Sequence, residues 1–297
     1  MFPIHLGLGS KTLFFYEGLY FLIAILAGAI WSKLRLKKYD VDVMDFETGF
    51  FWTLIGAMVG GRLSHFIFWE PSIILNDPII FLKVWQGGIS ITGGIFGGIV
   101  GAWLYLKKYK LNFIDCFAVV SPTLLMGQAV GRIGCFFNGD AHGIQTSSIF
   151  GVEFPRHGYL IPQFKKLTSM NSFPWDWSFS NGLVDFSSNV SAKLHPTQLY
   201  EGFGDIILLG IIVFIFMKFV GNRAVYWIIF FIHTGGYSFV RFLCEYIRAD
   251  RTGKLYGGMS TLQIGLLLWT ITSIILALYV FYKKDSINEH YNNKLRV

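Results

Sequence analysis

Long apolar stretches alternate with short polar segments along the whole chain of 297 residues. A helix needs about 20 mainly apolar residues to cross a bilayer. We therefore predict transmembrane helices over residues 13–31, 46–68, 89–106, 113–131, 199–217, 224–242 and 260–282. This pattern is typical of an all-α polytopic membrane protein, here with about seven spans in one transmembrane domain that covers residues 1–297.

The polar segment between the fourth and fifth predicted spans, residues 135–198, is too long for a simple connection. It carries Pro155, Pro162 and Pro174 among polar and aromatic residues. We predict that this segment forms a small extracytoplasmic cap, inserted into the transmembrane domain, with short strands or helices of its own.

Clusters of basic residues follow every second predicted span. They are Lys33, Arg35, Lys37 and Lys38; Lys107, Lys108 and Lys110; Lys218 and Arg223; and Lys283 and Lys284. With seven spans, all four clusters fall on one side of the membrane. Short loops rich in Lys and Arg stay in the cytoplasm, so we predict a cytoplasmic C-terminus and an N-terminus outside. The first span lacks a small-residue cleavage site, which favours a retained helix over a removed signal peptide.

The composition agrees with a membrane protein. Hydrophobic residues make up 53% of the chain and charged residues only 14%, against roughly 25% charged in soluble domains. The net charge of +7 resides mainly between apolar spans, so we predict no nucleic-acid partner. The three cysteines, Cys116, Cys135 and Cys244, form no CxxC pair, and we predict no disulfide framework, no metal site and no cofactor.

Glycine recurs through the second and third predicted spans. The positions are Gly56, Gly60, Gly61, Gly93, Gly94, Gly97, Gly98 and Gly101. Small residues at helical spacing let helix backbones approach closely in lipid. We interpret these glycines as packing residues and assign them no chemistry.

Ionisable residues inside apolar stretches are the main functional candidates, because each costs about 2.5–3.5 kcal/mol at a span's centre. Arg62 and Arg132 lie within or beside such stretches, and Arg241, Glu245 and Arg248 recur at spacings that place them on one helix face. One interpretation is an interfacial ladder of ion pairs. The other is an anion site for a phospholipid headgroup, in which arginine forks bind phosphate oxygens and Glu245 orients a guanidinium.

Two polar segments lie at the two ends of the predicted cap. Asn138, Asp140, His142 and Gly143 follow the fourth span, and could supply hydrogen bonds, proton transfer or close backbone approach to a ligand. The segment from His195 to Glu201 precedes the fifth span, with Thr197 as a candidate helix cap. A turn-rich helix exit explains the first segment equally well. Tyr200 and Glu201 could face either the site or the interface.

Several motifs, which follow one another along the chain in the family's order, resemble those of the prolipoprotein diacylglyceryl transferase family. They are Gly60-Gly61-Arg62; Trp85-Gln86-Gly87-Gly88-Ile89-Ser90 with Gly93-Gly94; Gly131-Arg132-Ile133-Gly134 with Asn138-Gly139 and Gly143; His195 through Glu201; and Tyr237 with Arg241-Phe242, Glu245 and Arg248. The family also has seven spans with the N-terminus outside. The resemblance covers almost the whole chain.

The resemblance implies transfer of a diacylglyceryl group from phosphatidylglycerol to the lipobox cysteine of a preprolipoprotein at the outer face of the bacterial cytoplasmic (inner) membrane, without a cofactor. The family's essential arginines fall on Arg132 and Arg241, and its supporting Glu and Arg on Glu245 and Arg248. We expect these four to be catalytic. We expect substrate binding by Arg132, Arg62, Asn138, Asp140, Gly143, His195, Tyr200 and Glu201.

This chain departs from the family pattern at four positions: Thr92 replaces a histidine proposed as the thiol's base, Cys135 an asparagine, Asp140 a glutamate and Phe21 a tyrosine. Threonine cannot act as a base near neutral pH, so the thiol would be activated in another way, with His142 and His65 as the nearby imidazole candidates. Thr92 stays a thiol-side candidate by its position in the motif. Two alternatives follow: a diverged homologue that uses a different acceptor, or a non-catalytic phospholipid-binding or transport protein. A transporter gains no support, because no internal repeat is visible.

Overall fold

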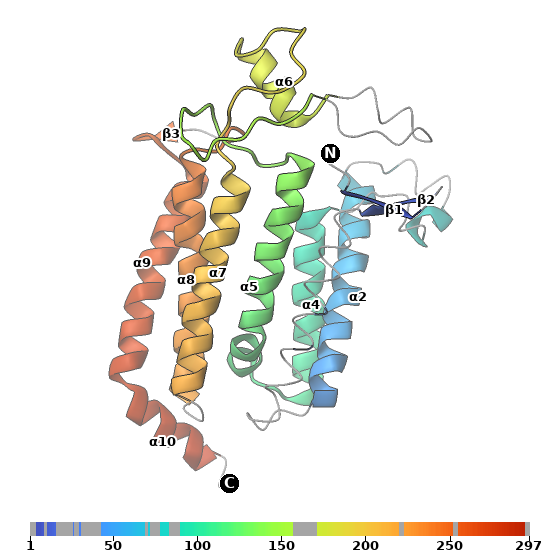
Figure 1. The fold of residues 1–297 in the computed structure, drawn as a ribbon. Helices are drawn as coiled ribbons and strands as arrows, with labels where there is room; N and C mark the ends of the chain where they lie inside the picture. Colours follow the sequence, from blue (N-terminus) through green and yellow to red (C-terminus); the bar gives the residue numbers. More distant parts are fainter. Residues whose placement is uncertain are drawn as a thin grey trace. The chain divides into compact units, whose positions relative to one another are not determined.

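The computed structural model describes residues 4–8, 11–15, 26, 30, 43–68, 71, 78–82, 90–156, 171–219, 223–251 and 255–294. The chain is mostly helical (Figure 1) and divides into two compact units. The first unit comprises Met1–Trp31 and Val120–Val297, and the second comprises Ser32–Val119.

The second unit is built around two closely packed helices. Its elements are α2 (Val43–Phe68), the 3-10 helix η1 (Pro78–Leu82), α4 (Ile91–Tyr109) and the beginning of α5 (Phe113–Asn138). A Cβ atom on Gly60 would lie 2.7 Å from Gly97 Cα, and one on Gly97 would lie 2.8 Å from Gly60 Cα. The predicted packing role is confirmed at Gly60 and Gly97, because any larger residue at either position would force α2 and α4 apart.

Replacing Gly97 by alanine should lower the stability of the protein by about 1–3 kcal/mol, the usual cost of overpacking. The added methyl group would overlap Gly56 O as well as Gly60 Cα. Gly94→Ala is the matched control on the same helix, because its Cβ would meet nothing closer than Ala57 O at 3.6 Å. Thermal unfolding in detergent measures both variants. Equal melting temperatures would contradict this packing.

The first unit holds most of the helices. Its elements are the hairpin β1 (Ile4–Leu8) and β2 (Lys11–Phe15), the end of α5, α6 (Phe173–Ser180), α7 (Thr197–Lys218), α8 (Arg223–Glu245), the hairpin β3 (Leu255–Tyr256) and β4 (Met259–Ser260), α9 (Thr261–Tyr282) and α10 (Lys284–Lys294).

Polar and small residues join the helices of the first unit. Ser121 Oγ of α5 and His233 Nδ1 of α8 lie 2.6 Å apart in a buried hydrogen bond. Gly202 of α7 lies against α5, since a Cβ there would be 3.3 Å from Arg132 Cβ and 3.4 Å from Ala129 O. These contacts pack α5 against both α7 and α8, and the one at Gly202 lies beside Arg132.

The segment between α5 and α7 occupies residues 139–196 and is slightly shorter than predicted, because α5 extends to Asn138 and α7 begins at Thr197. Its described part contains α6 and isolated β-bridges such as Pro155 with Val190. The Arg156 guanidinium stacks 4.1 Å from the ring centre of the fully buried Trp175. Figure 1 places α6 at the end of the unit where α7 begins.

Five helices among the described residues are long and apolar enough to cross a membrane: Thr48–Phe68, Phe113–Phe137, Thr197–Lys218, Ala224–Glu245 and Thr261–Tyr282. They match five of the seven predicted spans, so the protein is polytopic. The predicted span 89–106 corresponds to α4, which is helical but is not among the five. The predicted span 13–31 lies outside the described residues except at a few positions. Seven spans and their orientation remain predictions.

The sequence prediction was wrong at two points of secondary structure. Residues 13–15 belong to strand β2, so no helical span begins at residue 13. The described chain is also not purely helical, since it contains two short hairpins. At the turn between β3 and β4, Gly257 and Gly258 have φ values of 56° and 82°. Such a pair of left-handed residues forms a tight hairpin turn, which hydropathy does not reveal.

Candidate active site

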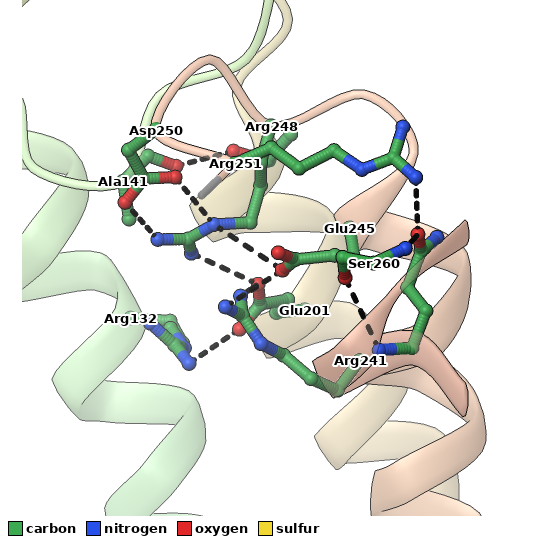
Figure 2. A network of polar contacts seen from close by, with 11 residues as sticks. Arg132, Ala141, Glu201, Arg241, Glu245, Arg248, Asp250, Arg251 and Ser260 are labelled. Atoms are coloured by element: carbon green, nitrogen blue, oxygen red, sulfur yellow. Dashed lines mark hydrogen bonds and ion pairs between the residues drawn. The ribbon is translucent and has the colours of Figure 1, made fainter. Parts of the chain in front are cut away.

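A single buried carboxylate, that of Glu201, lies at the centre of the charged cluster. Glu201 is 1% exposed and lies in the first turns of α7. Figure 2 shows three arginines pointing toward it from different elements. Arg132 of α5 pairs with Oε2, Arg241 Nη1 of α8 lies 2.6 Å from Oε1, and Arg248 Nη1 lies 3.3 Å from the same oxygen.

Glu245 forms a second carboxylate contact at the C-terminal end of α8. Its Oε2 lies 2.9 Å from Arg241 Nη2 and 3.9 Å from Arg248 Nε. Arg241 therefore spans two carboxylates, Glu201 through one nitrogen and Glu245 through the other. The predicted pairing of Arg241 and Glu245 on one helix face is confirmed, as is the expectation that Glu245 holds a guanidinium in place.

Arg248 does not lie on the same helix, because α8 ends at Glu245. The chain turns there, and Arg248 forms an isolated antiparallel bridge with Gly143. Ile144 N donates a 2.8 Å hydrogen bond to Ile247 O, and Gly143 N donates one of 2.8 Å to His195 O. These backbone bonds compete with continuation of the helix, which explains why the helical spacing failed at Arg248. They also join the segments around Gly143, His195 and Arg248 to one another.

Arg248 is held on its other side by Asp250. Arg248 Nε donates to Asp250 Oδ1 at 2.8 Å, and its Nη2 pairs with Oδ2. Burial lowers the pKa of Arg248, but the hydrogen bond and charge of Asp250, together with Glu201, raise it above its ordinary value. Arg248 is therefore charged at every physiological pH.

The charges of the cluster balance. Arg132, Arg241 and Arg248 contribute three positive charges, and Glu201, Glu245 and Asp250 contribute three negative charges. Arg132 and Arg241 retain side-chain exposures of 21% and 16%, so part of each side chain remains accessible. These two arginines are therefore the members of the cluster that an anion such as a phosphodiester can reach.

The sequence also matches known proteins. The family model described as prolipoprotein diacylglyceryl transferase matches residues 3–282 of the 297. The chain belongs to the prolipoprotein diacylglyceryl transferase family.

Three curated relatives bear the same name. Proteins named phosphatidylglycerol–prolipoprotein diacylglyceryl transferase resemble the chain at 33% identity in Fusobacterium nucleatum, over 73% of this chain and 78% of the relative. The Rickettsia conorii protein is 30% identical over 73% and 72%. The protein from Cupriavidus necator is 27% identical over 93% and 89%. The resemblance inferred from the motifs is therefore confirmed.

In this diacylglyceryl transferase family member, the polar residues around the predicted cap form a layer beside the arginines. His195 Nδ1 lies 3.2 Å from the Tyr200 hydroxyl. Gln198 Nε2 donates to Asp140 O at 2.5 Å, and the Thr197 hydroxyl donates to Ala141 O. The sequence suggested Thr197 as the helix cap, but Pro196 occupies that position. Thr197 instead ties α7 to the turn after α5.

Burial favours the neutral form of two histidines near the cluster. Burial lowers the pKa of His142, although its backbone contact with Gly143 opposes the shift, and burial also lowers the pKa of His195. His142 is 6% exposed, packs edge-on against Trp177 and places Nδ1 3.1 Å from Gly143 O. That carbonyl can only accept, so Nδ1 carries the hydrogen.

Three predicted site residues belong to the second unit. Arg62 is buried, donates from Nε to Phe81 O at 3.2 Å and from Nη2 to Ile80 O, and stacks over Phe66. These contacts hold η1 against α2. His65 packs edge-on against Phe66. Thr92 lies in the first turn of α4, and its side chain, like that of Asn138, lies outside the described residues.

Several contacts were not anticipated from the sequence. Glu201 was a candidate, but its central position was not predicted, and neither was the pairing of Asp250 with Arg248. Arg251 Nη2 donates to Gln263 Oε1, while Gln263 and Ser260 form a capping box at the start of α9. The order serine, two residues, glutamine before an apolar run is a known start signal that could have revealed this helix end.

Proposed function

We propose that the protein transfers the diacylglyceryl group of phosphatidylglycerol to the lipobox cysteine of prolipoproteins, the first step of bacterial lipoprotein maturation. The main supporting observation is the cluster of Arg132, Arg241 and Arg248 around the buried Glu201, in a member of this transferase family. The relatives' common name favours this function over lipid transport or a different acceptor.

The reaction needs stabilisation of a leaving phosphate. The cysteine sulfur attacks the glyceryl carbon that bears the phosphate, a C–S bond forms, and the C–O bond breaks with its electron pair on glycerol phosphate. Positive groups fixed where this charge develops are the largest single source of catalysis in many enzymes. The accessible parts of Arg132 and Arg241 are the groups we assign to the phosphate.

Glu201 and Glu245 position these arginines. Without carboxylates between them, three guanidinium groups would repel one another, and each would have many rotamers. The ion pairs fix each fork before the lipid arrives, so little ordering entropy is lost on binding. Gly143, His195 and Asp140 hold the segments that carry Arg248 and Glu201.

We place the reaction at the outer leaflet of the bacterial inner membrane. The basic loops predict a cytoplasmic C-terminus, and the cluster lies at the end of α7 nearest the segment 139–196. A seven-span arrangement would put that end outside, where phosphatidylglycerol and the lipobox of an exported prolipoprotein both occur.

Complementation tests the function in cells. In a strain depleted of its own transferase, the wild-type chain should restore growth and lipoprotein modification. Arg132→Ala, expressed at equal membrane levels, should not. Failure of the wild type at normal membrane expression would overturn the proposed function.

Replacing Gly143 by alanine should lower the transfer rate about 100-fold, the effect of displacing catalytic groups by about 1 Å. A Cβ at this position would lie 2.5 Å from His195 Cβ and 2.7 Å from Ile247 O, so the bridge to Arg248 must open. Initial rates on a lipobox peptide measure the effect. Gly131→Ala is the control beside Arg132, since its Cβ would meet nothing within 4 Å. Equal rates for both variants would contradict this role.

A further inference from the structure

A second polar layer lies one helical turn beyond the Arg132–Glu201 pair. Asp205 follows Glu201 by four residues on α7, and Gln128 precedes Arg132 by four residues on α5. The two helices run in opposite directions in the first unit (Figure 1), so both steps lead away from α6, by about 6 Å each. Gly202 against Ala129 fixes this antiparallel register, which places Asp205 and Gln128 at one level.

The oxygens of this layer lack donors. Asp205 is fully buried, and neither its Oδ1 nor its Oδ2 accepts a hydrogen bond from any residue that the structure describes. The buried Oε1 of Gln128 also accepts no hydrogen bond from the described residues. Buried polar atoms are nearly always hydrogen-bonded. All three atoms are acceptors, so the group that satisfies them must bring a hydrogen to donate.

The charges around Asp205 come from two helices. Arg132 of α5 and Glu201 of α7 both interact with it electrostatically. On α8, which packs against α7 through Val240 and Gly204, Arg241 extends to Glu201 and Glu245. Asp205 therefore lies beside the phosphate-binding arginines, next to Arg132, without being tied to an arginine by a described hydrogen bond.

The level of this layer suits the incoming thiol. In an in-line displacement the sulfur approaches carbon at about 3–3.5 Å, on the side opposite the departing oxygen. Sulfur and phosphate are then separated by close to one helical turn, about 5.4 Å. A thiol is a donor, and with an ordinary pKa of about 8.5 it is mostly protonated at neutral pH. Thr92 cannot take its proton.

We propose that Asp205, with Gln128 beside it, accepts the proton of the lipobox thiol during diacylglyceryl transfer; this step rests on the proposed function. The S–H proton passes to a carboxylate oxygen of Asp205, and the sulfur electron pair forms the C–S bond. The C–O bond breaks, and its electron pair leaves on glycerol phosphate. The proton then leaves Asp205 for the aqueous phase with that product.

The test compares the purified wild type with Asp205→Asn on two lipobox peptides, one with cysteine and one with selenocysteine. A selenol is ionised at neutral pH and needs no base. On the cysteine peptide, Asp205→Asn should lose about 10²- to 10⁴-fold in rate at pH 7. Its rate should rise about tenfold per pH unit toward the thiol's pKa. On the selenocysteine peptide it should approach the wild-type rate, which also shows that the variant is folded.

The controls separate this step from its alternatives. Asp185→Asn, an exposed acid in the segment 139–196, should match the wild type on both peptides. Equal loss on both peptides, or no loss on either, overturns the role of Asp205. The same selenocysteine-rescued loss in His142→Gln but not in Asp205→Asn also overturns it. A wild type inactive on both peptides overturns the proposed function and this step together, whereas an active wild type confines the failure to Asp205.

Discussion

Replacing Arg241 by alanine is expected to lower the transfer rate by about 10²- to 10³-fold, the usual cost of losing a group that stabilises developing negative charge. Arg241 contacts Glu201 at 2.6 Å through Nη1 and Glu245 at 2.9 Å through Nη2. The substitution removes one positive charge from the phosphate site and leaves Glu245 with only the 3.9 Å contact to Arg248 among the ion pairs of the described residues.

Arg241→Lys separates charge from geometry. An ammonium group carries the same charge but cannot bridge two carboxylates as a planar fork does, so lysine should restore only a small part of the rate. Initial rates on a lipobox peptide in lipid nanodiscs measure both variants. Arg251→Ala is the matched control, because Arg251 contacts Gly258 and Gln263 instead. A wild-type rate for Arg241→Ala would contradict the phosphate role.

Replacing Glu201 by glutamine is expected to lower the free energy of unfolding by about 3–5 kcal/mol, the cost of removing one partner from a buried ion pair. The variant keeps the shape of the side chain. It leaves Arg132, Arg241 and Arg248 around a neutral amide. Denaturation in detergent measures the loss, and Glu153→Gln, at an exposed carboxylate, is the control. Equal stabilities would contradict the central place of Glu201.

The same variant should respond more strongly to anionic lipid. A ligand that binds only the folded state stabilises it by an amount that grows with affinity. Phosphatidylglycerol would supply the negative charge that Glu201→Gln lacks, so its melting temperature should rise more than that of the wild type. Phosphatidylcholine, whose headgroup is neutral overall, should produce no such difference.

The sequence predicted much of this arrangement. Arginines in apolar stretches and the four-residue spacing of Arg241 and Glu245 identified the charged cluster, because ions in a membrane are too costly to be accidental. It could not show that Glu201 binds all three arginines, since that depends on how α5, α7 and α8 pack. The turn that carries Arg248 out of α8 was also hidden, because it depends on pairing with Gly143, more than 100 residues earlier.

The helices were predictable for a different reason. Their length and apolar content follow from the thickness of a bilayer, which is the same for every chain. The hairpin at Gly257 and Gly258 and the eight-residue helix α6 are too short to produce such a signal. The buried Asp205 was not predicted as a site residue, because it lies in an otherwise apolar predicted span.

Mass spectrometry of a lipobox peptide after incubation with the purified protein and phosphatidylglycerol is the decisive test of diacylglyceryl transfer. We expect a diacylglyceryl group in thioether linkage on the peptide cysteine, with one glycerol phosphate released for each peptide modified. Arg132→Ala and Arg241→Ala proteins that still insert into the membrane should yield neither product. Phosphatidylglycerol bound by the wild-type protein without either product would contradict the transfer function.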